Sequence, residues 1–321
     1  MLTNYPRIDT DDPFGVPPDT LGMQADEMRR LGYRVVDMVV DRALRRNEEH
    51  AILTGDPADL LARLGGPLPE DPMDPDASLD LMAEGALSHQ QHGDHPRYFA
   101  RVPGPASFAG ILGEWMGTGF NTISSSWGGG SGPAAVEMVV TSWLAEMLGM
   151  PKHTEGVLVS GGSIANMTGF AVARSENGHG VAYVTDQTHS SLPRDLRQMG
   201  CDPGNIHMLT SDASYRMSAS SLRAAIASDK EKGRRPMLVV ATAGSTNTGA
   251  AGPLDEIADI CRDEGMWLHV DGAYGGPAAI TPQGREYLKG LDRADSVVLD
   301  PHKWFFQPYD VGACLVTRPG A

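Results

Sequence analysis

From about Ser131 onward, short apolar runs alternate with stretches that have helical periodicity. The periodicity predicts helices at Ala134–Leu148, Ile164–Arg174, Ser190–Met199, Ser218–Lys232 and Leu254–Glu264. The apolar runs predict strands at Val157–Val159, Val181–Val184, Ile206–Leu209, Met237–Val240, Trp267–Val270, Ser296–Leu299 and Ala313–Val316. Because these runs are continuously apolar, both faces of the sheet are expected to be buried. The pattern predicts an α/β fold with a mainly parallel, seven-stranded sheet flanked by helices.

The first hundred residues have a different pattern. One apolar stripe at spacings of three and four consists of Met28, Leu31, Val35, Met38 and Val39, and the pattern repeats from Leu79 to Ala86. Pro-rich connections separate these helices, and the acidic stretch Glu70–Asp80 is expected to be a solvated connector. We therefore predict an N-terminal helical arm over residues 1–95, packed on the rest of the chain or on a second copy, and a larger domain over residues 96–321.

The chain of 321 residues is strongly acidic, with 26 Lys and Arg against 41 Asp and Glu, a formal net charge of −15. Such a field repels phosphate backbones and anionic lipids, which argues against nucleic-acid and membrane partners. The N-terminus lacks the pattern of a secretory signal. The cysteines, Cys201, Cys261 and Cys314, are far apart and odd in number, which indicates neither a disulfide framework nor a zinc knuckle. We expect a soluble, cytoplasmic protein.

The segment Ser160–Asn166 follows a predicted strand and opens a predicted helix. Gly161 and Gly162 let backbone N–H groups approach an anion, Ser163 adds a hydroxyl, and the helix N-terminus supplies partial positive charge. The pattern suits a phosphate. A tight turn with a Ser cap is an equal alternative, and a nucleophile elbow is a third, because the segment is one residue away from G-x-S-x-G.

Three further residues follow predicted strands. Asp271 stands at a strand end before small residues, where a carboxylate can hold a cationic heterocycle nitrogen. Lys303, between His302 and Trp304, is placed where desolvation would make it a nucleophile toward carbonyls. His189 can stack on a planar ring or transfer a proton. Each has an ordinary structural explanation when taken alone, but in this order the four signals form the set that pyridoxal 5′-phosphate (PLP) needs.

The segment HVDGAYGG, residues 269–276, followed by DPHKW, residues 300–304, resembles the group II PLP-dependent amino-acid decarboxylases, the family of aromatic-L-amino-acid decarboxylase. Supporting segments are HPRYFARVPGP, SGPAAVEMVVTSWLAEMLGMP, GGSIAN, DQTHSS and ATAGSTNTG. The resemblance implies the PLP-dependent transferase fold type I. It also implies PLP as the cofactor, bound by the domain over residues 96–321, and an obligate homodimer with its sites at the subunit interface.

The resemblance also implies a role for each matching residue. Lys303 would form the internal aldimine, Asp271 would pair with the pyridinium N–H, and His189 would stack on the ring. The other implied cofactor contacts are Gly162, Ser163 and His302 near the phosphate, Thr246 near the ring substituents and Ala273 against the ring face opposite His189. The implied reaction is decarboxylation of an aromatic L-amino acid to the amine and CO2.

Two departures from the family pattern stand out. Aromatic members usually carry Asn where this chain has Asp300, so an acid near the phosphate would have to point away or be neutralised. The chain ends at Ala321, before the mobile catalytic loop and the small C-terminal domain of the family, so the resemblance indicates a chain truncated at its C-terminus.

Several alternatives stay open. The chain could be a truncated, non-catalytic protein that keeps the fold, act on an acidic amino acid such as glutamate, or convert an amino acid oxidatively to an aldehyde. A serine hydrolase with Ser163, Asp271 and His302 is a remote alternative. The spacing of His89, His92 and His95 invites a metal, but Pro96 would break a helix that carried them, and we expect no metal site. The Gly-rich segment Trp127–Pro133 is expected to be a loop.

Overall fold

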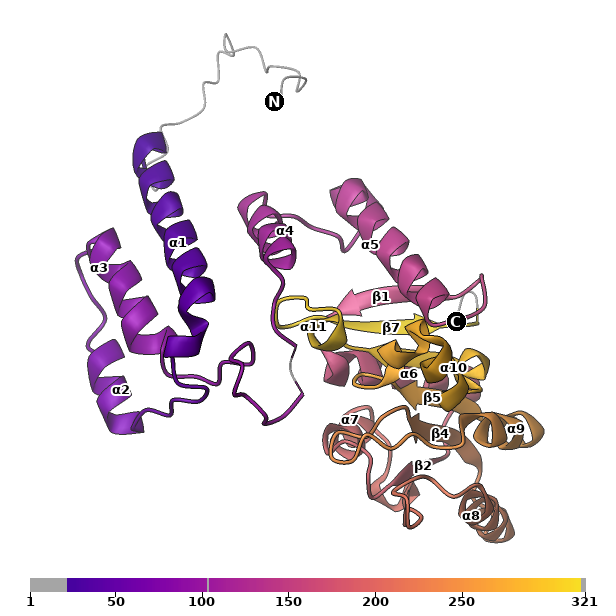
Figure 1. Ribbon diagram of the computed structural model, residues 1–321. Helices are drawn as coiled ribbons and strands as arrows, with labels where there is room; N and C mark the ends of the chain where they lie inside the picture. Colours follow the sequence, from indigo (N-terminus) through magenta and orange to yellow (C-terminus); the bar gives the residue numbers. More distant parts are fainter. Residues whose placement is uncertain (1–21, 103, 319–321) are drawn as a thin grey trace. The chain divides into compact units, whose positions relative to one another are not determined.

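The computed structural model describes residues 22–102 and 104–318 (Figure 1). These residues form two compact units, which divide between Tyr98 and Phe99. The second unit is built on a seven-stranded sheet with the order β1-β7-β6-β5-β4-β2-β3. Its strands are β1 (Glu155–Val159), β2 (Val181–Thr185), β3 (Ile206–Leu209), β4 (Pro236–Thr242), β5 (Trp267–Asp271), β6 (Ser296–Leu299) and β7 (Gly312–Val316). All seven predicted apolar runs are strands, and the predicted α/β sheet is confirmed.

The sheet is mainly parallel, as predicted. Strands β2, β3, β4, β5 and β6 pair with one another in parallel, whereas β7 is antiparallel to both β1 and β6. Because two reversals restore the direction, β1 points the same way as β6. The carboxyl ends of β1, β2, β4, β5 and β6 therefore lie at one edge of the sheet. Loops that follow these strands are the usual place for a ligand in such folds.

Helices cover both faces of the sheet, which explains why the strands are apolar on both sides. One face packs against α6 (Gly162–Asn177) and α7 (Ser191–Gln198), with a core that includes Phe170, Leu192, Leu196 and Leu238. The opposite face packs against α5 (Trp127–Met147), α8 (Ala219–Glu231), α9 (Leu254–Glu264) and α10 (Pro282–Tyr287), with Leu144, Leu222, Ile257 and Leu288 in its core. Figure 1 shows this layered arrangement around the sheet.

Helix α5 corrects one prediction, because it begins at Trp127 and includes the Gly-rich segment expected to be a loop. Ser126 caps the helix by accepting a hydrogen bond from the Gly129 N–H at 3.1 Å. At Gly130 the backbone leaves the helical region, and a Cβ there would lie 1.6 Å from the Ile123 carbonyl oxygen, so glycine is needed at this kink. Before α5 comes α4 (Phe108–Gly119). In the described part of the chain, no helix combines the length and apolarity needed to cross a membrane.

The first unit is helical. It contains α1 (Ala25–Arg45), α2 (Pro57–Leu64), α3 (Pro75–Asp80) and a π-helical segment, Leu81–Leu87. The prediction that Glu70–Asp80 is a solvated connector is wrong for its second half, because α3 lies there. Arg30 of α1 forms an ion pair with Asp76, and Arg34 forms one with Asp80, each at 2.5 Å. Local periodicity could not reveal these ion pairs, because their partners lie more than 40 positions apart along the chain.

Candidate active site

The residues predicted to form a cofactor site all follow strands that end at the same edge of the sheet. Asp271 is the last residue of β5, and Lys303 belongs to the short helix α11 (Pro301–Trp304), which follows β6. His189 lies in the loop after β2, and Thr246 lies in the turn after β4. Gly162 and Ser163 open α6 directly after β1. The parallel register thus gathers residues that are far apart in the sequence.

The turn from β1 into α6 has the geometry of an anion cradle. Gly161 has a φ of +86°, a conformation that favours glycine, and it precedes the first residue of α6. On β7, a Cβ at Gly312 would lie 2.5 Å from the carbonyl carbon of Gly161, so the two backbones are in close contact. The first N–H groups of α6 lack helical acceptors and carry the positive end of the helix dipole, which suits a phosphate group.

Arg194 is a cation at this turn that sequence reasoning missed. Its Nη2 donates a hydrogen bond to the Ser163 Oγ at 3.3 Å, and its Nε donates to the buried Asp195 at 3.1 Å. Arg194 lies on α7, 31 positions from Ser163, and half of its side chain is exposed. No local pattern marks it, because only the packing of α7 beside α6 brings the guanidinium to the turn.

Asp271 is a buried carboxylate at the end of the central strand. Its side chain accepts a hydrogen bond from the Ala273 N–H at 3.1 Å. Burial raises the pKa of Asp271, and nearby Asp300 raises it further, whereas the Ala273 N–H, Lys303 and His189 lower it. Lys303, His189 and the second acid, Asp300, are thus all close enough to act on the Asp271 carboxylate. A group that binds here must supply positive charge or an N–H donor.

Lys303 is half-buried and paired with Asp300. Its Nζ lies 2.9 Å from Asp300 Oδ2, and the other carboxylate oxygen, Oδ1, is buried without a hydrogen-bond partner in the described part of the chain. The Asp300 side chain lies against Gly162, since a Cβ on that glycine would come within 2.8 Å of Oδ2. The acid at position 300 therefore does not point away from the anion cradle, and the Lys303 ammonium neutralises it.

The remaining predicted residues lie around this centre. His302 is buried, its Nδ1 donates to the Val311 carbonyl oxygen at 2.7 Å, and its Nε2 lies 3.7 Å from Asp300. Ala273 is also buried, and its carbonyl oxygen accepts from the Asp300 N–H at 3.3 Å. His189 and Thr246 are exposed. The Nδ1 of His189 accepts from Ser191, which leaves Nε2 as the protonated nitrogen of the neutral ring.

Gly104 is a second residue that sequence reasoning missed. Its N–H donates to the His302 carbonyl oxygen at 3.1 Å, and a Cβ at this position would lie 1.8 Å from the Lys303 carbonyl oxygen. The segment around Gly104 therefore supports the backbone that carries Lys303. Gly104 lies in the segment HPRYFARVPGP, which supports the family resemblance, but its Pro-Gly-Pro run at residues 103–105 is typical of any turn and gives it no specific role.

The geometry gives no support to the hydrolase or metal alternatives. Within the described residues, the hydrogen-bond partner of the Ser163 hydroxyl is Arg194, and no hydrogen bond joins it to a histidine. His89, His92 and His95 each contact a different group, namely Ser88, Arg42 and the Arg97 N–H. Over residues 22–102 and 104–318, no cluster of three or more His, Cys, Asp or Glu could hold a metal ion.

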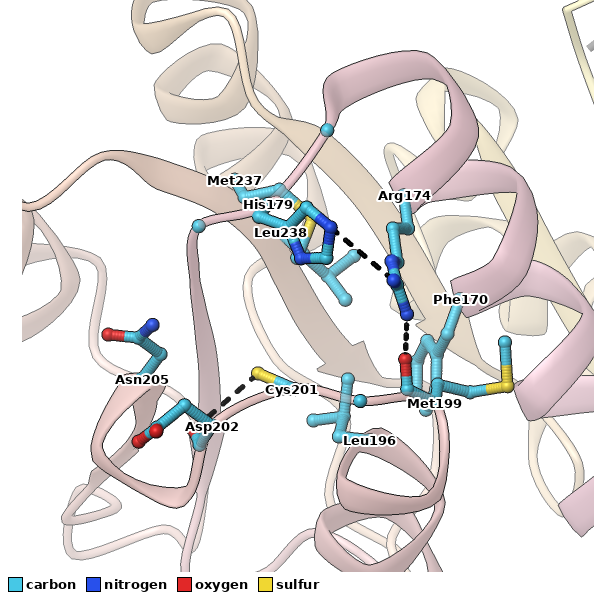
Figure 2. A pocket seen from close by; sticks show the side chains of 13 residues that line it. Phe170, Arg174, His179, Leu196, Met199, Cys201, Asp202, Asn205, Met237 and Leu238 are labelled. Atoms are coloured by element: carbon cyan, nitrogen blue, oxygen red, sulfur yellow. Dashed lines mark hydrogen bonds between the residues drawn. The ribbon is translucent and has the colours of Figure 1, made fainter.

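A separate pocket lies at the opposite ends of the strands (Figure 2). It is lined by residues of α6, α7 and the start of β4 and by the loops that precede β2 and follow α7, including Arg174, His179 and Cys201. Arg174 is engaged there by the Met199 carbonyl oxygen and by His179. None of the predicted cofactor residues lines this pocket, which is therefore distinct from the site at the carboxyl edge.

Comparison with known proteins identifies the family. The model of the pyridoxal-dependent decarboxylase conserved domain matches residues 67–321. The chain belongs to this family. Over 303 residues it is 40% identical to an aromatic-L-amino-acid decarboxylase of Bacillus atrophaeus, covering 93% of this chain and 63% of the relative. Over 315 residues it is 33% identical to a tryptophan decarboxylase of Camptotheca acuminata, covering 92% and 62%.

Solved structures agree with this assignment. The Oryza sativa protein named TDC, solved with PLP and tryptamine, superposes with a TM-score of 0.87 at 28% identity, covering 92% of this chain and 64% of that chain. The predicted PLP-dependent transferase fold is confirmed. The chain spans about three fifths of the length of the curated relatives described above.

PLP, the cofactor of this family, fits the residues at the carboxyl edge. An α6 N-terminus with a serine and an arginine suits its phosphate, and a buried carboxylate suits the N–H of its ring. The amine of Lys303 suits its aldehyde. PLP would also stabilise side chains whose burial destabilises the ligand-free fold. The clearest case is Asp271, whose carboxylate charge is disfavoured by burial.

We expect Asp271→Asn to stabilise the PLP-free chain at pH 7. Burial raises the folded-state pKa of Asp271, so its ionisation destabilises the fold as the pH rises above the unfolded value of 3.8. Asparagine cannot ionise, and the gain should disappear below that pH. Urea unfolding of PLP-free variants at pH 7 and pH 3.5 measures this, with the exposed Asp71→Asn as control. Equal stability at pH 7 would contradict the expectation.

We expect Gly104→Ala to disturb Lys303. A Cβ has no room beside the Lys303 carbonyl oxygen, so the backbone of α11 must shift, at a cost of roughly 1–3 kcal/mol. PLP retention, measured by absorbance after gel filtration, should fall. Gly113→Ala in α4 is the matched control, since nothing lies within 4 Å of its Cβ position. Equal retention of PLP by the two variants would disprove the supporting role.

Proposed function

We propose that the protein containing this chain is a PLP-dependent carboxy-lyase that converts an aromatic L-amino acid to its amine and CO2. The observation that carries the proposal is the meeting of Lys303, Asp300 and Asp271 beside the anion cradle of α6. The names of the relatives, which include aromatic-L-amino-acid and tryptophan decarboxylases, support the substrate class.

In this proposal each residue has a defined task. Lys303 would hold the cofactor through Nζ, which lies 2.9 Å from Asp300. Asp271 would accept a hydrogen bond from the ring N–H and keep that nitrogen protonated. When bound, the cofactor supplies an electron sink for the negative charge left by the departing CO2.

Further side chains hold the cofactor's remaining groups. Gly162, Ser163 and Arg194 would hold the phosphate, with His302 nearby. His189 and Ala273 would contact the ring, and Thr246 would contact its substituents. The exposed positions of His189 and Thr246 support this assignment, because a ligand can reach both of them.

One relative supports a second candidate, oxidative conversion of the amino acid to an aldehyde. A solved structure named 4-hydroxyphenylacetaldehyde synthase, from Rhodiola rosea, superposes with a TM-score of 0.86 at 30% identity, covering 92% of this chain and 67% of that chain. An acidic substrate such as glutamate is the remaining alternative within the same family. Two measurements distinguish these three reactions: whether the product is an amine or an aldehyde, and which amino acid is consumed.

We also propose that the protein is a cytoplasmic homodimer with an N-terminal arm over residues 1–95 and a PLP-binding domain over residues 96–321. The division between Tyr98 and Phe99 supports the boundary. The free thiols Cys201, Cys261 and Cys314 support a reducing compartment. Apolar side chains exposed on α4 and α5 support self-association, namely Phe108, Leu112, Met116, Val136, Met138 and Trp143.

The central experiment combines labelling with turnover. We expect borohydride reduction of the PLP-loaded chain to leave a cofactor-sized mass on the peptide that contains Lys303. From the protein that contains this chain, we also expect CO2 and the amine when L-DOPA, tryptophan or tyrosine is supplied. Lys303→Ala should abolish the label and reduce CO2 release by roughly a hundredfold or more.

The other outcomes separate the alternatives. Glutamate as the preferred substrate would favour an acidic-amino-acid decarboxylase, and an aldehyde product would favour oxidative conversion. Label at Lys303 with no product from any amino acid would favour the non-catalytic alternative. Label on a different lysine would overturn the assignment of the site.

The homodimer has its own test. We expect Leu112→Asp, which places a charge among exposed apolar side chains of α4, to raise the dimer dissociation constant at least about tenfold. Sedimentation velocity over a range of concentrations measures it. Met208→Asp on β3 is the matched control, because Met208 is an apolar residue with a similar exposed fraction, 55% against 44% for Leu112. Equal dissociation constants for both variants would argue against this surface.

A further inference from the structure

Strand β5 carries an unusual row of polar side chains toward α6. Trp267, His269 and Asp271 alternate onto one face, and their exposed fractions are 0%, 0% and 6%. The His269 ring packs edge-on against the Phe170 ring of α6, and the two ring centroids are 5.0 Å apart. Polar atoms at such a buried position destabilise the fold unless each one is hydrogen-bonded. Each donor and acceptor in this row therefore needs a hydrogen-bond partner.

A continuous chain of hydrogen bonds runs through this row. The Trp267 Nε1–H donates to the Ser296 Oγ at 2.8 Å, and this direction is fixed because an indole N–H can only donate. Asn166 Oδ1 can only accept, so the proton of the neutral imidazole is on Nε2, which donates to that oxygen at 2.8 Å. His269 Nδ1 is therefore an acceptor, and the Ser296 hydroxyl donates to it at 2.7 Å.

The chain of hydrogen bonds ends on the anion cradle. The amide nitrogen of Asn166 donates to the Gly162 carbonyl oxygen at 2.8 Å. Gly162 is the first residue of α6, whose N–H groups form the cradle. Two positions along β5 from His269 stands Asp271, the carboxylate at the other end of the proposed cofactor site. The relay, defined as Trp267, Ser296, His269 and Asn166, thus joins the elements that carry both ends of the site.

Close packing of α6 on β5 also connects the helix that carries the anion cradle to the strand that carries Asp271. A Cβ at Gly169, three residues after Asn166, would lie 2.5 Å from His269 Cε1, so this helix rests directly on the imidazole. Burial lowers the pKa of His269 to about 3, which keeps the ring neutral and the relay in one protonation state near pH 7. A rigid and non-titrating contact is suited to holding a fixed distance.

We propose that the relay sets the spacing between the anion cradle at Gly162 and the carboxylate of Asp271, with His269 and Asn166 as positioning residues. The inference rests on the proposed function, in which these two ends hold the phosphate and the ring of one PLP molecule. A ligand that spans both ends needs the correct spacing. A ligand that uses one end alone does not.

The test therefore compares three probes on the PLP-free chain: PLP, pyridoxal, which lacks the phosphate, and inorganic phosphate. His269→Phe keeps a ring but removes both hydrogen bonds. We expect the dissociation constant of PLP to rise about tenfold, whereas those of pyridoxal and phosphate change less than about twofold. His269→Gln, which can accept from Ser296 and donate to Asn166, should restore most of the PLP affinity.

Two further variants keep the test decisive. Asn166→Ala breaks the relay at its last step and should reproduce the pattern even if His269→Phe does not fold. Tyr183→Phe removes a buried hydrogen bond to Asp229, 3.0 Å long, elsewhere in the sheet and should leave all three constants unchanged. Equal weakening of all three probes, or unchanged PLP binding by folded variants, would overturn the spacing role. Failure of the wild-type chain to bind PLP at Lys303 would instead overturn the proposed function.

Discussion

A buried carboxylate at the end of β5 is the constraint on which the rest of the site depends. Asp271 accepts the Ala273 N–H, but its surroundings still disfavour its charge, and burial raises its pKa. A sheet without a ligand would be more stable with an apolar residue there. The carboxylate therefore makes sense as half of an interaction whose other half is a cationic or N–H-bearing group, and the family's cofactor supplies such a group.

One ion pair and one further cation lie at the carboxyl edge that also carries this carboxylate. Asp300 brings a second buried acid to the carboxyl edge, and the Lys303 ammonium lies against it at 2.9 Å. At position 300 this chain thus couples Lys303 to a counter-ion. Arg194 brings a further positive charge to the anion cradle, beside Ser163. The net effect is an edge where a dianionic phosphate and a protonated ring can each find a partner.

Close backbone packing keeps these groups in register. Gly162 leaves room for Asp300, Gly104 for the Lys303 carbonyl oxygen, and Gly312 for Gly161. At each position a Cβ would come within 3 Å of its neighbour, so even alanine would force a shift. The buried relay from Trp267 to Asn166 extends the same principle to polar groups, because every hydrogen bond in it has a single possible direction.

The sequence by itself determined the layered α/β sheet and the chemistry-bearing residues. Continuous apolar runs predict all seven strands because burial on both faces leaves a local trace, and HVDGAYGG and DPHKW mark Asp271 and Lys303. Predictions from local patterns were wrong for the Gly-rich start of α5 and for the acidic stretch that contains α3. A helix cap and a kink determine the structure at the start of α5, and ion pairs with distant arginines stabilise α3.

Only the tertiary structure decided how the site is held together. The pairing of Asp300 with Lys303, the approach of Arg194 to Ser163 and the contact of Gly104 with Lys303 follow from the packing of loops and helices at the sheet edge. His269 and Asn166 lie 103 positions apart, and neither carries a local sign of the other. Such contacts depend on which elements become neighbours in space, and hydrophobic periodicity encodes the faces of elements but not their neighbours.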